Sequence, residues 1–183
     1  DTLVQLLQAR LGRLSDGSQK VGQACAILGN VASFEALQYI SGLQDEGLVE
    51  KLEQLLHYNV LFEADNIYHF VHPLLREVIQ LGISPPRLKL LHRNAAEAIE
   101  HHFPETLTMR AGQVANHYML AGKREKAAFY ADIATEHALM MTALSDAHRF
   151  VLLSIEAEPT PDRQLKLQKI IALINANNVG TFF

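Results

Sequence analysis

The sequence contains a single cysteine, Cys25, among its 183 residues, so no disulfide can form within the chain. Cys25 lies in the apolar run Ala24-Cys25-Ala26-Ile27-Leu28, which predicts a small buried hydrophobic side chain rather than a nucleophile. A chain that folds without disulfides suits a reducing compartment, so we expect a cytoplasmic protein.

Long apolar runs and an excess of basic residues are also missing. No segment approaches the ~18–20 consecutive apolar residues of a membrane span and no signal peptide is visible, so we expect no membrane contact. With 16 basic and 20 acidic residues, the formal net charge is -4, and the chain has no general basic field to attract nucleic acid. The sequence begins at Asp1 instead of methionine, and we interpret it as a piece of a longer protein.

Sequence signatures of catalysis and of cofactor binding are absent as well. No Gly-x-x-x-x-Gly-Lys-Ser/Thr loop occurs, so the chain cannot hold a nucleoside triphosphate unaided. The pairs His101-His102 and His69/His72 could suggest a metal, but adjacent helical residues point ~100° apart and no third ligand accompanies either pair. We therefore predict that this segment is not an enzyme and holds no catalytic residue, metal site or cofactor of its own.

The segment from Val60 to Val78 is the one stretch whose pattern is not helical throughout. Two short β-prone runs, residues 60–62 and 67–70, are separated by the polar turn cluster at residues 63–66. His72-Pro73 then opens a helical pattern, and proline is well suited to a first helical turn. A hairpin that leads directly into a helix, with helices upstream, is typical of a winged-helix unit.

Three helices of the winged-helix unit are predicted upstream of this hairpin, after a linker helix over residues 1–14. Ser15 and Ser33 are helix-start residues, and Gly29 and Gly42 mark helix ends. The third helix, residues 44–58, would enter the major groove if the unit read DNA. Since each phosphate contact needs a cation or another donor, an acidic surface there argues against direct binding of nucleic acid. Residues 44–66 hold one lysine and six acids, which are Asp45, Glu46, Glu50, Glu53, Glu63 and Asp65.

Downstream of the hairpin, small residues recur at regular spacing. They let paired helices approach closely in tetratricopeptide repeats, although alanine-rich stripes also occur in ordinary helical bundles. Gly122-Lys123 is the predicted turn within a helix pair. A last helix over 162–176 is predicted to precede a frayed end from Asn175 to Gly180. The repeat-like positions are Ala115, Tyr118, Gly122, Ala127, Ala131 and Ala134, and the inward residues of the last helix are Leu165, Ile170, Leu173 and Ile174.

These patterns predict a mainly α-helical fold class. Residues 1–14 form a linker helix, and residues 15–83 form a winged-helix unit with a short β-hairpin. Residues 84–183 form a tetratricopeptide-like α-helical solenoid.

Three stretches of the chain are similar to parts of a known family. They are Leu-Gln-Ala-Arg-Leu-Gly-Arg-Leu-Ser at residues 7–15, the alanine- and cysteine-rich helix before Leu-Gly at 24–29, and Tyr-His-Phe-Val-His-Pro-Leu-Leu-Arg-Glu-Val at 68–78. Together with the order of the segments, they resemble the STAND class of signal-transduction ATPases, which includes maltose-regulator-type activators and cyclase- or kinase-linked regulators. The resemblance implies an upstream ATPase core in the same chain that binds ADP or ATP.

One position gains a role from this resemblance. In related ATPases of the apoptotic and plant-resistance type, a Met-His-Asp motif ends the winged-helix hairpin, and its histidine contacts the β-phosphate of bound ADP. Val71-His72-Pro73 occupies that place, so only His72 matches, and Pro73 removes a carboxylate and a backbone N–H donor. The resemblance implies that His72 contacts ADP when the upstream core is present. Alternatively, His72 caps the helix or packs against the hairpin.

The function that follows is a non-catalytic regulatory and protein-interaction segment of a larger STAND-type signalling or transcription-regulating ATPase. The winged helix would gate the nucleotide-bound core, and the helical repeats would bind a protein partner or a small inducer. One alternative is a winged-helix DNA-binding regulator with a helical dimerisation tail, which would need a basic reading surface. Another is a freestanding tetratricopeptide scaffold capped by the winged helix.

Overall fold

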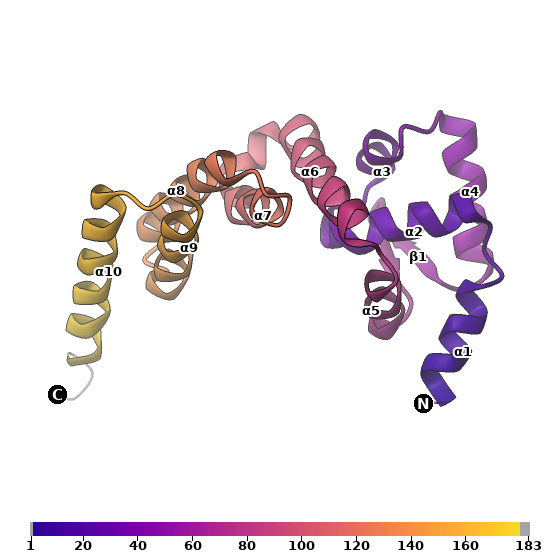
Figure 1. Ribbon diagram of the computed structural model, residues 1–183, viewed down its shortest axis with the longest axis horizontal. Coiled ribbons are helices and arrows are strands. Elements are labelled where there is room, and N and C mark those ends of the chain that lie inside the picture. The colour runs from indigo at the N-terminus through magenta and orange to yellow at the C-terminus, as the bar shows by residue number, and fades with distance from the viewer. Residues whose placement is uncertain (1, 180–183) are drawn as a thin grey trace. The chain divides into compact units, whose positions relative to one another are not determined.

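The computed structural model describes residues 2–179, and in that range the chain forms ten α-helices and one two-stranded antiparallel sheet (Figure 1). The predicted mainly α-helical class with a short β-hairpin is therefore confirmed. Gly180, placed in the predicted frayed end, and the last three residues of the predicted solenoid lie outside the described range. Among residues 2–179, no helix combines the length and the apolar content needed to cross a bilayer.

The chain divides into two compact units, Asp1–Ala98 (unit 1) and Ile99–Phe183 (unit 2). The division falls within a single helix, α6 (Pro85–His102). The boundaries predicted after residues 14 and 83 were drawn between sequence motifs, whereas this division is between compact bodies. The two predicted boundaries therefore stay predictions.

Unit 1 begins with four helices whose ends are set by local signals. The side chains of Ser15 and Ser33 accept hydrogen bonds from backbone N–H groups three residues further on, at 3.2 and 3.3 Å, as expected of N-cap residues. Gly29 and Gly42 end two helices with φ angles of +61° and +67°, a region that favours glycine. These predicted starts and ends are confirmed. The helices are α1 (Thr2–Leu11), α2 (Asp16–Leu28), α3 (Phe34–Ser41) and α4 (Asp45–His57), and a 3-10 turn at Gly29–Val31 follows α2.

The core of unit 1 lies around α2, which contacts α3, α4 and the helix after the hairpin, α5 (Pro73–Leu81). Cys25 in α2 is 1% exposed, and Leu37, Leu48 and Leu75 from the other helices are fully buried. Burial raises the pKa of the Cys25 thiol to about 12, because a thiolate there would have no water around it. The predicted buried cysteine is confirmed.

The hairpin is tighter than predicted. Strands β1 (Leu61–Ala64) and β2 (Ile67–Phe70) pair antiparallel. Only Asp65 and Asn66 form the turn, and their φ angles of 53° and 60° are typical of a two-residue type I′ connection. The predicted four-residue turn was wrong because aspartate and asparagine both tolerate the left-handed conformation, so the two residues before them can stay in the strand.

Strand β2 is also tied to the segment between α2 and α3. The N–H group of Tyr68 donates to the carbonyl of Ala32 at 2.9 Å, and Ser33 forms an isolated antiparallel bridge with Ile67. These contacts fix the hairpin to the helical part of unit 1.

Helix α5 (Pro73–Leu81) follows the hairpin and is held against α2 by two side chains. Nε of Arg76 and the amide nitrogen of Gln80 both donate to the carbonyl oxygen of Ala26, at 2.8 and 2.9 Å. That carbonyl lies in the last turn of α2, where the helix dipole favours a cation such as the Arg76 guanidinium. The bonds therefore join two helices that are far apart in the sequence.

Unit 2 contains a row of helices joined by three-residue links. Gly122 and Thr142 lie in the first two links with φ angles of 75° and 55°, which confirms the predicted turn at Gly122-Lys123. Links this short make neighbouring helices antiparallel, and Figure 1 shows α7, α8 and α9 side by side. The helices are α7 (Leu107–Leu120), α8 (Arg124–Met140), α9 (Leu144–Ala157) and α10 (Pro161–Val179), preceded by a 3-10 turn at Pro104–Thr106.

The repeat-like small residues of unit 2 are buried. Ala115, Ala127 and Ala131 are 0% exposed, and Ala134 is 4% exposed. Their short side chains let the helix backbones approach closely. A second cluster joins the later helices and contains Ala138, Ala147, Val151 and Ile170.

Helix α10 packs through a narrower face than predicted. Ile170 is 1% exposed and Ile174 packs partly against the core, but Leu165 and Leu173 are each 50% exposed. Leu167 joins the contact instead. The helix carries apolar residues on more than one face, and only the face around Ile170 meets α9. The helix also continues beyond its predicted end at residue 176, so the predicted frayed end is wrong up to residue 179.

A charged network links three helices of unit 2. Arg163 in α10 donates through Nε and Nη2 to the Asp132 carboxylate in α8, at 3.0 and 2.8 Å. Ser154 in α9 donates its hydroxyl to the same carboxylate, and Nη1 of Arg163 bonds the Glu158 carboxylate at 3.0 Å. The Arg163 side chain is only 14% exposed, and its hydrogen bonds to Asp132 raise the pKa of the guanidinium.

We expect Cys25 in the folded protein to react with a disulfide reagent at pH 8 several orders of magnitude more slowly than a free thiol, because the thiolate is the nucleophile. The measurement is the rate of labelling by Ellman's reagent. The guanidinium-unfolded protein is the control and should react at the ordinary rate. Rapid labelling of the folded protein would contradict the burial of α2.

Replacement Asp132→Ala should lower the free energy of unfolding by about 2–3 kcal/mol, because it leaves a mostly buried guanidinium without its main partner. Urea unfolding measures the change. The matched control is Asp146→Ala, which removes the exposed Asp146–Arg149 pair and should cost no more than about 0.5 kcal/mol. Equal losses in the two variants would show that the network contributes no more than a surface ion pair.

Candidate functional site

His72 is the N-cap residue of α5, directly after the hairpin. Its backbone is extended, with φ −137° and ψ 132°, and its Nδ1 atom accepts a hydrogen bond from the N–H group of Leu74 at 3.1 Å. Pro73 takes the first helical position, where its missing N–H group costs nothing. The structure therefore shows the capping arrangement that the sequence offered as an alternative role for His72.

The capping bond also determines how the imidazole could bind a second group. A neutral imidazole has one acceptor nitrogen and one N–H donor. Since Nδ1 accepts from Leu74, Nε2 carries the proton and is the donor. The ring is exposed at the surface of unit 1, so the capping contact and a contact with an anion can exist together. The implied contact of His72 with ADP stays a prediction.

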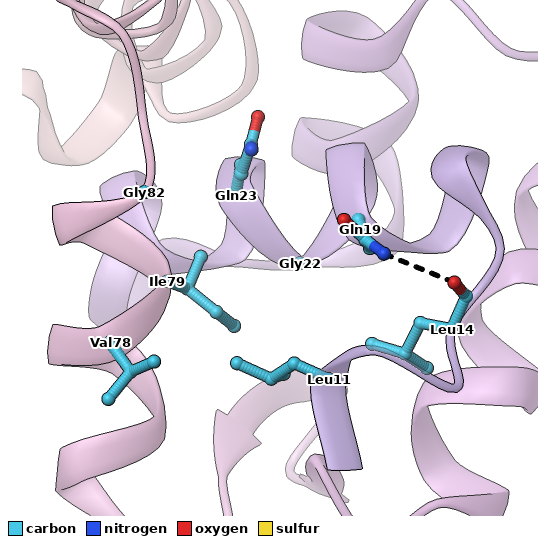
Figure 2. Close-up of a pocket in the computed structure, with 8 residues that line it drawn as sticks. All are labelled: Leu11, Leu14, Gln19, Gly22, Gln23, Val78, Ile79 and Gly82. Carbon is cyan, nitrogen blue, oxygen red and sulfur yellow. Dashed lines mark hydrogen bonds between the residues drawn. The ribbon is translucent and has the colours of Figure 1, made fainter. Parts of the chain in front are cut away.

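A small cavity lies between α2, α5 and the end of α1 (Figure 2). Leu11 and Ile79 point toward each other across it, Gly22 lies at its α2 side, and Gln19 donates its amide to the carbonyl of Leu14 at 3.2 Å. Its volume of about 160 Å³ is below the ~300 Å³ at which ligand pockets usually begin. The cavity has room for about one apolar side chain.

The acids of the third helix and the hairpin all lie on the surface. The one lysine of this region, Lys51, bonds the Glu50 carboxylate at 2.9 Å, and its side chain is 23% exposed. The surface that would face DNA in a DNA-reading unit therefore carries an excess of negative charge. The exposed acids are Asp45, Glu46, Glu50, Glu53, Glu63 and Asp65.

Unit 2 contains a groove along α7 and α9, which we call the α7/α9 groove. Its first cavity, of about 310 Å³, is lined by residues that include Met109, Met141 and Phe150. Its second cavity, of about 350 Å³, is lined by residues that include Leu152, Glu156 and again Phe150. The ring of Phe150 therefore separates the two cavities.

The position of Phe150 depends on the absence of a side chain in α7. A Cβ atom added at Gly112 would lie 2.2 Å from Cζ of Phe150, far inside van der Waals contact. The guanidinium of Arg149 lies over the Phe150 ring, 4.4 Å from its centre. The tip of the aromatic ring thus lies against Gly112 of α7, and a cation covers the face of the ring.

No three histidine, cysteine, aspartate or glutamate side chains in the described part of the chain are placed to hold a metal ion together. The rings of His101 and His102 meet edge to face at 4.6 Å, and His69 stacks on Phe62 at 5.4 Å. Three of the four histidines in the pairs noted in the sequence thus make contacts between aromatic rings, and the fourth, His72, caps α5.

The sequence did not single out the residues of the α7/α9 groove. Gly112 could have indicated that another element packs closely against this helix. Glycine inside a helix costs about 1 kcal/mol relative to alanine, so its presence there often reflects such a close approach. The partner in that approach, Phe150, lies in another helix and could not be identified from the pattern.

Comparisons of the chain with protein-family models, with curated proteins and with solved structures find no match. What the chain does is therefore inferred from its own residues and their geometry. Two features are available for this inference, the histidine at the start of α5 and the α7/α9 groove.

We expect Gly112→Ala to lower the free energy of unfolding by about 1–2 kcal/mol, because the new methyl group displaces the Phe150 ring. In a Phe150→Ala background the same change should instead raise it, by up to about 1 kcal/mol, through the higher helix propensity of alanine. Urea unfolding of the four proteins in this double-mutant cycle measures both effects.

The control for this cycle is Gly47→Ala in α4, where an added Cβ meets nothing within 4 Å. That variant should be stabilised in either background. If Gly112→Ala has the same effect with and without Phe150, the ring does not lie against the α7 backbone.

Proposed function

We propose that the chain is a non-catalytic regulatory and interaction segment of a larger signal-transduction ATPase of the STAND class. In this proposal residues 15–83 form a winged-helix unit, and residues 84–183 form tetratricopeptide-like repeats. The parent protein contains an upstream core that binds ADP or ATP, and this segment gates that core. The protein works in the cytoplasm.

The observation that carries the proposal is the direct passage from the hairpin into α5 through His72. Helices α2, α3 and α4 precede the hairpin, as in a winged helix, and β2 is tied to the segment between α2 and α3. His72 caps α5 with Nδ1 and keeps Nε2–H as a donor on the surface. A phosphate oxygen of ADP is a suitable acceptor for that donor, and the N-terminus of α5 also favours an anion.

The pairing of helices in unit 2 supports the second half of the proposal. Antiparallel helices with three-residue links and buried alanines at their contacts are the features expected of tetratricopeptide-like repeats. Such repeats build a continuous surface from equivalent helices. In this chain the α7/α9 groove is the hollowed part of that surface and is the proposed site for a protein partner or a small inducer.

The proposed mechanism is a hinged switch. In the inactive state the winged-helix unit is docked on the ADP-bound core, and His72 contributes one hydrogen bond to the nucleotide. Nucleotide exchange or partner binding removes that contact, and the unit is released. The exposed acids of α4 and of the hairpin disfavour DNA as the target of the released unit, so the proposal includes no direct contact with nucleic acid.

The test is the amount of ADP that copurifies with the parent protein, measured after denaturation, in native form and with His72 replaced. His72→Ala removes both the cap and the Nε2–H donor. His72→Ser keeps a side chain that can cap the helix, since serine is a good N-cap residue, but it cannot reach the nucleotide. We expect native protein to retain ADP and both variants to lose most of it.

The serine variant separates the two roles of His72. Loss of ADP in His72→Ala alone would show that the cap is required and the contact is not, which contradicts the assigned role of the imidazole. A native parent protein that carries no nucleotide would contradict the membership of the STAND class itself. Thermal unfolding of each variant controls for the cap, whose loss costs about 1 kcal/mol.

A further inference from the structure

Methionine is unusually exposed around the first cavity of the α7/α9 groove. Met109 and Met141, which line it, are 72% and 65% exposed, although methionine is normally a core residue. Methionine side chains are unbranched and polarisable, so they adapt to apolar groups of different shapes. Together with Phe150 they form an apolar surface that is open to a binding partner.

The shape of the groove fits a polypeptide better than a small inducer. A small ligand is held by a pocket that covers most of its surface, but here the apolar rim stands open to solvent. The groove offers two separate cavities, one on each side of Phe150. Two cavities in a row along one helix match apolar side chains that recur along a peptide.

The charges along the groove indicate the sign of the charge that a partner should carry. Asp146 at the first cavity is paired with Arg149 at 2.9 Å, so these two charges cancel. Glu156 at the second cavity has no ion pair among the described residues. The guanidinium of Arg124 donates to the backbone carbonyls of Glu156 and Ala157. His137 and His148 also line the cavities. With both counted as neutral, Asp146, Arg149 and Glu156 give the lining a formal net charge of -1, which favours a partner with lysine or arginine.

We propose that the α7/α9 groove binds a cationic amphipathic peptide segment of a partner protein. Its apolar side chains enter the two cavities on either side of Phe150, and a lysine or arginine meets Glu156. The inference rests on the proposed function, because it names the class of partner that the helical repeats bind. A small inducer in the same groove is the competing occupant.

The probe is a fluorescein-labelled peptide of about 18 residues, built from leucine and lysine with leucine at positions i, i+3, i+4 and i+7. At the ~1.5 Å rise of an α-helix this length exceeds the ~15 Å along α9 between Asp146 and Glu156. One comparison peptide carries glutamate in place of lysine, and another has the same composition in scrambled order. Fluorescence anisotropy with the whole 183-residue chain measures the Kd of each.

The residues replaced in the protein variants are exposed, so we expect every variant to fold. Met109→Gln combined with Met141→Gln should weaken binding of the lysine peptide by about tenfold or more. The matched control is Met140→Gln, a residue that is 72% exposed but lines neither cavity, and its effect should stay below about twofold. Glu156→Lys should remove the preference for the lysine peptide over the glutamate peptide, whereas Glu125→Lys at the start of α8 should not.

Three results would overturn the inference. They are no binding of the lysine peptide below about 1 mM, equal affinity for the glutamate or scrambled peptide, and binding that is unaffected by the groove variants. The outcome is separable from that of the ADP experiment. If the parent protein retains ADP through His72 but the groove binds no peptide, only this inference fails. If the groove binds the peptide but the parent protein holds no nucleotide, the groove stands and the STAND proposal fails.

Discussion

The close approach of helices in unit 2 is the constraint on which the rest of that unit depends. Buried alanines at the contacts let the backbones of α7 and α8 pack closely against each other. Gly112 likewise allows α9 to approach α7 closely, because the Phe150 ring of α9 lies where a side chain on α7 would otherwise be. The two cavities of the groove exist because the ring is held in that position.

In unit 1 the contacts that matter most are those that fix the position of one short helix, α5. Pro73 occupies the first position of α5, and His72 caps its first turn. Further along the helix, Arg76 and Gln80 donate hydrogen bonds to the last turn of α2. The imidazole is fixed by its Nδ1 bond, so its second nitrogen has a defined direction and tautomer. A structural role and a binding role therefore use different atoms of the same ring and do not compete.

Local signals in the sequence were sufficient for several helix ends of unit 1. Ser15, Ser33, Gly29 and Gly42 act within one turn of their own position, so their roles could be predicted. The outward position of Leu165 and Leu173 could not, because periodicity identifies apolar faces but not which face has a neighbour. The Asp132–Arg163 network and the Phe150–Gly112 contact join residues in different helices, and no pattern within one helix encodes them.

The two strands of the hairpin have different surroundings, and this bears on how the protein avoids self-association. β2 has a neighbour on each side, whereas β1 pairs only with β2 among the described residues and leaves an outer edge. An unpaired edge is a template on which another chain can add a strand. Here the edge strand has four residues and carries the exposed Glu63, with Asp65 beside it in the turn. Short length and negative charge therefore disfavour edge-to-edge pairing with another chain at the outer edge of β1.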